Sequence, residues 1–124
     1  MTNRRPVYLD LRHIRLPVPG LMSILHRVSG VLMVLAIPFF SALFARALAS
    51  EDGFYAVSAL LGGLPGQLML VVLAWGLLHH LLAGLRYLAL DLGWGLEREQ
   101  ARLTARAVLY AAVALTLAGV VVLR

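Results

Sequence analysis

Three long stretches without a charged side chain constrain the fold of this chain more than any other feature. They are residues 28–45, 53–85 and 107–123, and only His79 and His80 in the middle stretch can titrate. A helix that spans a bilayer needs about 20 mostly apolar residues, and each stretch reaches that length with its flanks. A soluble helical bundle would need polar faces, which these stretches lack. We therefore expect an all-α membrane protein with three transmembrane helices.

Helix-breaking and charged residues set the expected bounds of these helices. Pro17 and Pro19 resist a continuous helix and predict an extended or turning lead-in. Pro38 is expected to kink the first helix, and a loop with Glu51 and Asp52 is expected after it. The expected segments are a polar arm at 1–20, helices at about 21–49, 67–90 and 103–123, and a membrane anchor that comprises 21–124.

The arginines predict how the chain is oriented in the membrane. All basic residues are Arg, and seven of the eleven lie before the first helix or between the last two, whereas the first loop has none. The positive-inside rule then places the N-terminus and the second loop in the cytoplasm. The same rule explains the net charge of +5, so membrane lipid and not nucleic acid is the expected partner. The chain has no cysteine, which excludes iron–sulfur ligation by its own residues.

Six candidate residues with polar or ionisable side chains lie in or at the mouth of the apolar segments, where such groups are costly and usually face a bundle interior or a ligand. They are Ser23, His26, Arg27, His79, His80 and Arg86. No Asp or Glu lies between residues 53 and 90. That absence argues against a proton-coupled transporter built around a membrane carboxylate.

Helical spacing makes His80 a candidate ligand. His80, Gly84, Tyr87 and Asp91 share one helix face, whereas His79 points about 100° away. Glycine at position 84 permits close approach of another helix or of a flat macrocycle such as a porphyrin. Neutral imidazole is a common axial ligand of haem iron, but a membrane histidine is as often a hydrogen-bond partner between helices. The spacing leaves both interpretations open.

The polar residues before the first apolar stretch fit the same site. If the membrane boundary lies near Leu21 and Asp91, His80 is about 16 Å deep and Arg27 about 9 Å deep. The carboxylates of a macrocycle ligated at His80 would then point towards Arg27 and His26, and an arginine pairs with carboxylates in a bidentate fork. Ser23 is one turn from Arg27, so both can face a small polar ligand such as a quinone carbonyl. Alternatively, Arg27 extends to lipid headgroups.

Two motifs carry a resemblance to a known family. They are S-x-x-H-R-x-[ST]-G, present as SILHRVSG from Ser23 to Gly30, and H-x-x-x-G-x-R followed by D-x-G, present as HLLAGLRYLALDLG from His80 to Gly93. With them the whole chain resembles the cytochrome b membrane-anchor subunit of bacterial succinate dehydrogenase.

The resemblance implies roles for individual residues. His80 matches the axial ligand of haem b, beside Gly84. Ser23, Ile24 and Arg27 match the ubiquinone pocket, and His26 and Arg27 match positions near the haem propionates. Arg86 and Asp91 match motif positions of structural or proton-related role, and Tyr87 replaces a histidine common in relatives, which puts a proton-transfer role there in doubt.

The resemblance also implies a division of labour. A flavoprotein subunit and an iron–sulfur subunit oxidise succinate, and a second small membrane anchor shares the haem by supplying its other axial ligand. This chain would pass electrons to ubiquinone in the bacterial inner membrane as part of a hetero-oligomeric helix bundle. The alternatives are a haem-free anchor, a fumarate reductase anchor and, from another class, a small transporter or channel subunit.

Overall fold

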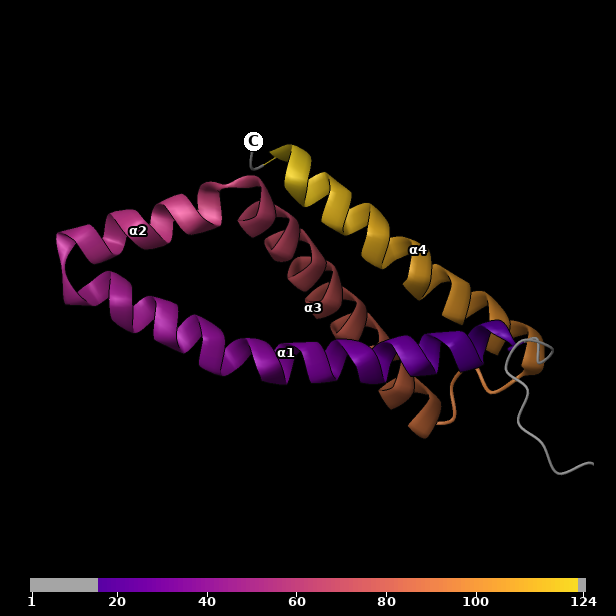
Figure 1. Ribbon diagram of the computed structural model, residues 1–124. Helices are drawn as coiled ribbons and strands as arrows, with labels where there is room; N and C mark the ends of the chain where they lie inside the picture. Colours follow the sequence, from indigo (N-terminus) through magenta and orange to yellow (C-terminus); the bar gives the residue numbers. More distant parts are fainter. Residues whose placement is uncertain (1–15, 123–124) are drawn as a thin grey trace, which may run out of the picture.

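The computed structural model describes residues 16–122, which form four helices and no strand in that range. They are α1 (Val18–Ala49), α2 (Glu51–Gly62), α3 (Leu64–Asp91) and α4 (Arg98–Val122) (Figure 1). Of the predicted arm at 1–20, residues 1–15 lie outside the described residues. α1 begins at Val18, before the expected start at Leu21, because a proline such as Pro19 is tolerated in the first turn of a helix. The helix continues through Pro38.

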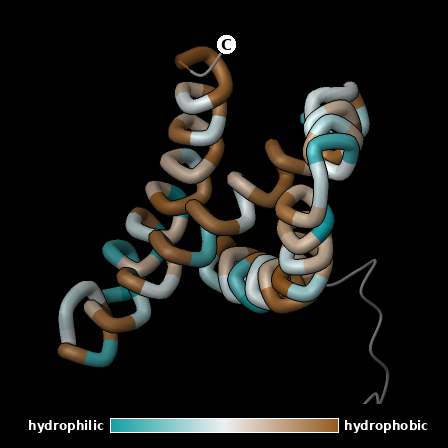
Figure 2. The backbone as a smooth tube through the Cα atoms, turned by 90° about the vertical axis from the view of Figure 1, so that its left-hand side faces the viewer, coloured by the Kyte–Doolittle hydropathy of each residue, from teal (hydrophilic) through white to brown (hydrophobic). Residues whose placement is uncertain are grey.

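Three of the four helices are long and apolar enough to cross a membrane: α1, α3 and α4. The shortest of them has 25 residues, which gives a length of about 38 Å, more than the ~30 Å of a hydrocarbon core. Large apolar side chains point outward on each, as at Val34, Leu77 and Leu117, and hydrophobic residues follow the helices on more than one side (Figure 2). A surface of this kind belongs in lipid, so the prediction of an all-α membrane protein is confirmed.

Small side chains hold the three long helices together. The core cluster joins Met22 of α1, Ala83 of α3 and Ala105 of α4, and Ala112 and Thr116 continue the buried side of α4. Because lipid tails are as apolar as leucine, membrane helices associate mainly through close packing of small residues. Three alanines, Ala83, Ala105 and Ala112, are therefore fully buried between the helices, whereas many of the bulky apolar residues face outward.

The segment that the sequence predicts as a loop contains a helix. α2 has 12 residues, and the Ser50 side chain caps it by accepting a hydrogen bond from the Gly53 amide at 3.0 Å. Glu51 and Asp52 lie in its first turn, where negative charge is favourable. α2 folds back along the second half of α1 (Figure 1), and a tight corner follows, at which a Cβ on Gly66 would collide with the Leu60 carbonyl. The loop was expected because the segment begins with two charged residues and ends in a run of Gly and Pro, signals that are also compatible with a short helix between two turns.

The D-x-G motif ends α3 and turns the chain towards α4. Gly93 has a φ of 84°, and the amides of Gly93 and Trp94 donate to the carbonyls of Leu90 and Ala89, each at 2.9 Å. This pattern is a Schellman motif, in which the left-handed position favours glycine. The left-handed backbone conformation therefore explains why the motif has a glycine at this position.

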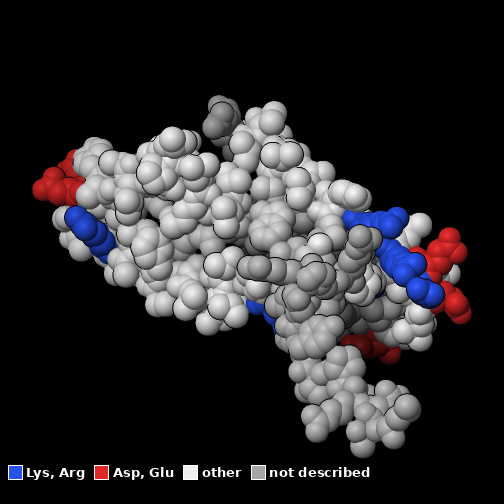
Figure 3. Space-filling view, turned by 45° about the vertical axis from the view of Figure 1, so that its right-hand side comes forward, with Lys and Arg blue, Asp and Glu red and all other residues white. Residues whose placement is uncertain are grey.

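Charged side chains gather mainly at the two ends of the molecule, and between them the visible face shows only a small basic patch at its lower edge (Figure 3). One end has Arg46, Glu51 and Asp52, where α1 meets α2; the other has the charged residues of the α3–α4 loop and the start of α4. Such a distribution suits a protein whose two ends lie in the headgroup layers of a bilayer.

Candidate functional site: paired histidines where α1 crosses α3

The crossing of α1 and α3 brings His26 and His80 into direct contact. Their rings stack with centroids 4.0 Å apart and an interplanar angle of 17°. With membrane boundaries near Leu21 and Asp91, His80 is expected to lie deeper than the residues at the mouth of α1. The helices cross (Figure 1), so residues at different expected depths meet.

Three glycines allow the helices to approach this closely. A Cβ on Gly30 would lie 3.0 Å from Cε1 of His80, and one on Gly76 would lie 3.9 Å from the Cβ of Ser29. A Cβ on Gly84 would lie 3.8 Å from Nε2 of His26. Gly84, which the sequence marks as a notch beside His80, therefore borders the His26 ring, and Gly30 is the notch that receives His80.

The hydrogen bonds around His80 determine which of its nitrogens carries the proton. Nδ1 lies 3.0 Å from the carbonyl oxygen of His26 and 3.3 Å from Oγ of Ser29. The Ser29 hydroxyl donates to the same carbonyl at 2.8 Å. Because a carbonyl oxygen only accepts, Nδ1 must be the donor, and the lone pair of neutral His80 is on Nε2.

A ligand-binding imidazole has this arrangement, with one nitrogen fixed by a backbone carbonyl and the other available. His80 is half-buried, so part of its ring faces outward from the bundle. Nε2 of His26, in contrast, is buried and has no hydrogen-bond partner within the described part of the chain. The crossing thus holds one anchored imidazole and one unsatisfied buried nitrogen, both of which suit a bound group.

Ser23, Ile24 and Arg27 lie on the adjacent face of α1. Nη2 of Arg27 donates to Oγ of Ser23 at 3.4 Å, so the structure brings these two together. Arg27 and Ile24 are exposed and Ser23 is half-buried. The face is open to whatever packs against α1, and other chains would have to complete a pocket there.

Tyr87 and Arg86 lie beside the histidine pair but contact different partners. The Tyr87 ring lies 5.2 Å from that of His26 at an angle of 57°. Arg86 extends to α4, where Nε donates to Oγ1 of Thr104 and Nη2 to the Ala101 carbonyl, each at 2.9 Å. Arg86 therefore ties α3 to α4, and Asp91 is exposed at the end of α3.

Two residues near the crossing received no role from the sequence. Ser29 is fully buried beside His80, and its place in the first motif, three residues after His26, is the signal that could have identified it. His79 is also fully buried and stacks on Trp75 at 5.4 Å, with neither ring nitrogen hydrogen-bonded within residues 16–122. No sequence pattern separates His79 from its neighbour His80.

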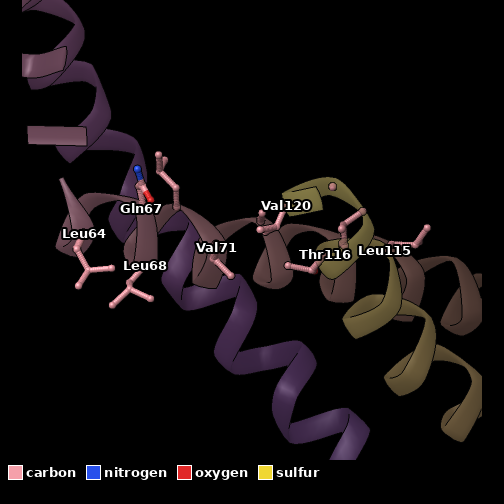
Figure 4. A pocket seen from close by; sticks show the side chains of 11 residues that line it. Leu64, Gln67, Leu68, Val71, Leu115, Thr116 and Val120 are labelled. Atoms are coloured by element: carbon pink, nitrogen blue, oxygen red, sulfur yellow. The ribbon is translucent and has the colours of Figure 1, made fainter. Parts of the chain in front are cut away.

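A separate cavity of about 430 Å³ lies between α3 and α4. Figure 4 shows it with its lining residues, which are apolar except for Gln67 and Thr116. Thr116 already donates to the Ala112 carbonyl at 2.7 Å. The cavity contains none of the predicted site residues, so it is distinct from the histidine crossing.

The three apolar helices and the stacked imidazoles at the crossing of α1 and α3 define a multi-pass helical membrane protein with a polar site inside its bundle. The chain belongs to the succinate dehydrogenase/fumarate reductase transmembrane subunit family, whose model matches residues 1–119. The resemblance stated from the sequence motifs is thereby confirmed.

Curated relatives are named cytochrome b subunits of succinate dehydrogenase. The chain is 37% identical to the succinate dehydrogenase cytochrome b556 subunit of Coxiella burnetii, over 97% of this chain and 98% of that protein. It is 33% identical to the cytochrome b556 subunit of Paracoccus denitrificans, over 95% and 91% of the two chains. It is 34% identical to the cytochrome b560 subunit of Reclinomonas americana, over 84% and 76%.

Proposed function

We propose that this chain is the haem b-binding membrane anchor of a succinate dehydrogenase and that it forms part of the ubiquinone-reduction site. Membership of the family and the cytochrome b names of its relatives support the proposal. The partners are a flavoprotein subunit, an iron–sulfur subunit and a second small membrane anchor. The complex lies in the bacterial inner membrane, with the N-terminus of this chain in the cytoplasm.

The observation that carries the haem assignment is the hydrogen bond between Nδ1 of His80 and the His26 carbonyl. It leaves Nε2 as the free ligand atom and fixes the ring plane. His80 would supply one imidazole to the haem; within the described residues no group of three or more His, Cys, Asp or Glu forms a metal site. One axial position of a haem requires no more, and the other falls to the second anchor subunit. When bound, the haem supplies a one-electron carrier in the membrane.

The neighbouring residues suit the carboxylates of a haem. The buried Nε2 of His26 lacks a hydrogen-bond partner within the described chain, and a propionate or a water would satisfy it. Arg27 follows directly and brings a permanent positive charge, which pairs with a carboxylate in a bidentate geometry. His26 and Arg27 are thus assigned to the haem edge, and Gly30 and Gly84 to the close packing around it.

The quinone residues act through hydrogen bonding. The Ser23 hydroxyl and the Arg27 guanidinium donate to a carbonyl oxygen of ubiquinone and stabilise the negative charge that develops as electrons arrive. Ile24 offers an apolar contact to the ring. Such donors are effective only where water is excluded, so the exposed face of α1 needs the partner subunits to cover it.

A fumarate reductase anchor remains a second candidate, because the family description includes both enzymes. The direction of the reaction depends on the quinone and on the catalytic subunits. A transporter or channel subunit would not belong to this family, so the match favours an anchor over that class.

The test is His80→Ala in the complex purified from its native membrane. The reduced-minus-oxidised visible spectrum should lose its b-type bands, whereas succinate oxidation with an artificial dye should persist if the complex assembles. His79→Leu is the matched control, since it changes the adjacent histidine on another face and should keep the bands. A normal haem spectrum in His80→Ala would overturn the ligand assignment. If the wild-type complex contains no haem, the chain is instead a haem-free anchor.

A further inference from the structure

We propose that Ser29 is a positioning residue that tunes the electron donation of His80 to a bound haem. The inference rests on the proposed function, because it takes His80 as the axial ligand. It concerns a residue that neither the sequence motifs nor the comparisons give a role. Its basis is a three-membered hydrogen-bond arrangement that links Ser29, the His26 carbonyl and the His80 ring.

The Ser29 side chain is buried where α1 crosses α3, so its hydroxyl needs a hydrogen-bond partner within the protein. Its exposed fraction is 0%, and its Cβ lies against Gly76 of α3. A hydroxyl without a partner in such a place would cost free energy. Its donated bond to the His26 carbonyl, at 2.8 Å, meets that requirement. The same carbonyl oxygen is also the acceptor for Nδ1 of His80.

The His26 carbonyl therefore serves two side-chain donors. Nδ1 of His80 lies 3.0 Å away and the Ser29 hydroxyl 2.8 Å away. The two donors compete for the electron density of one oxygen, so the hydroxyl weakens the bond from Nδ1. A second oxygen, Oγ of Ser29 itself, lies 3.3 Å from Nδ1. This contact limits rotation of the ring, so that Nδ1 keeps facing the His26 carbonyl.

The strength of the Nδ1–H bond controls how electron-rich Nε2 is. A stronger bond gives the ring more imidazolate character, makes it a better donor and stabilises oxidised iron. A variant without the hydroxyl leaves His80 as the only side-chain donor to the His26 carbonyl. The haem midpoint potential should then fall, and the ring should occupy a wider range of orientations.

Thr and Val at position 29 form a matched pair, because they have the same shape and differ only in the hydroxyl. The complex is purified with Ser29→Thr, with Ser29→Val and with the native serine. The haem-to-protein ratio, the midpoint potential and the electron paramagnetic resonance spectrum of the ferric haem are then measured. Ser29→Thr should keep the native potential and spectrum. Ser29→Val should have a lower potential and broader resonance features.

The outcomes separate the two proposals. Equal potentials and spectra in both variants, or a higher potential in Ser29→Val, would overturn the role of Ser29 and leave His80 as the ligand. Bands that persist in His80→Ala would instead refute His80 as the axial ligand, the part of the proposed function on which the inference rests. Ser29→Ala serves as a second hydroxyl-free variant if Val disturbs packing, and it should also lower the potential. An unchanged potential in Ser29→Ala would again refute the inference.

Discussion

At the scale of single residues, two neighbouring faces of α1 carry different chemistry. Met22, His26 and Ser29 turn towards α3, where the first and last are fully buried. Ile24 and Arg27 are exposed on the adjacent face. Since successive residues on a helix point about 100° apart, a run as short as SILHRVSG presents a packed face and an open face at once, which the proposed function assigns to the haem edge and to the quinone.

Replacing Arg27 tests the quinone face. Arg27→Leu removes a charged donor, and loss of one such donor typically costs about 10²–10³-fold in rate. Ubiquinone reduction by the complex should fall by that order, and dye reduction with succinate should remain. Arg27→Lys keeps the charge without the fork geometry, so its rate of ubiquinone reduction should lie between those of the native complex and of Arg27→Leu. Full quinone activity in Arg27→Leu would contradict the assignment, and Arg46→Leu, at the far end of α1, is the control.

At the scale of elements, the contact between α3 and α4 combines small residues with one polar tie. Ala83 and Ala105 are fully buried in it, and Arg86 bridges to Thr104 and to the Ala101 carbonyl. Contacts between alanines are not directional, so these hydrogen bonds determine the position of α4 along α3. They also hold the turn of α3 next to Tyr87, which contacts His26.

A double-mutant cycle measures this tie. Hydrogen bonds to a charged group contribute about 1.5–3 kcal/mol, so Arg86→Leu should lower the thermal midpoint of the detergent-solubilised complex. Thr104→Val should cost less, and its effect should be smaller in the Arg86→Leu background, because the shared bond is already lost. Arg102→Leu, on an exposed part of α4, should leave the midpoint nearly unchanged. Simple additivity of the Arg86 and Thr104 effects would contradict the tie.

The elements also show what the sequence could and could not predict. The three spanning helices follow from uncharged runs, and the polar residues within them mark His80, Ser23 and Arg27 as candidates. α2 could not be found in the same way, because residues 53–85 are continuously apolar in character and its start has only a cap as signal. Spacing along one helix defines a face, but it does not give the angle at which a second helix crosses it. The stacking of His26 on His80 and the role of Ser29 depend on that angle.

At the scale of the whole molecule, the charged ends define two membrane faces. Arg98, Arg102 and Arg106 are exposed at the start of α4, on the side expected in the cytoplasm, and Glu51 and Asp52 lie at the opposite end. A cysteine-free chain makes this orientation directly measurable.

Single cysteines placed at the two ends test the orientation. In Arg98→Cys, a membrane-impermeant maleimide should label the 13.5 kDa chain in inside-out vesicles but not in intact spheroplasts. In Glu51→Cys the pattern should reverse. The unmodified chain is the control, since it has no thiol to react. Labelling of Glu51→Cys only from the cytoplasmic side would contradict the expected topology.

The crossing of α1 and α3 has a mechanical consequence. α1 has 32 residues, about 48 Å, which exceeds the ~30 Å hydrocarbon core, so the helix tilts or extends into the headgroups. When bilayer thickness changes, a tilted helix rotates about the point where it is held most closely. Between α1 and α3, the closest glycine contact is that of Gly30 with the His80 ring, and displacement relative to α3 grows with distance from it. The ends of α1 and the attached α2 therefore absorb a thicker or thinner membrane, and the imidazole lies at the pivot, where the motion is least.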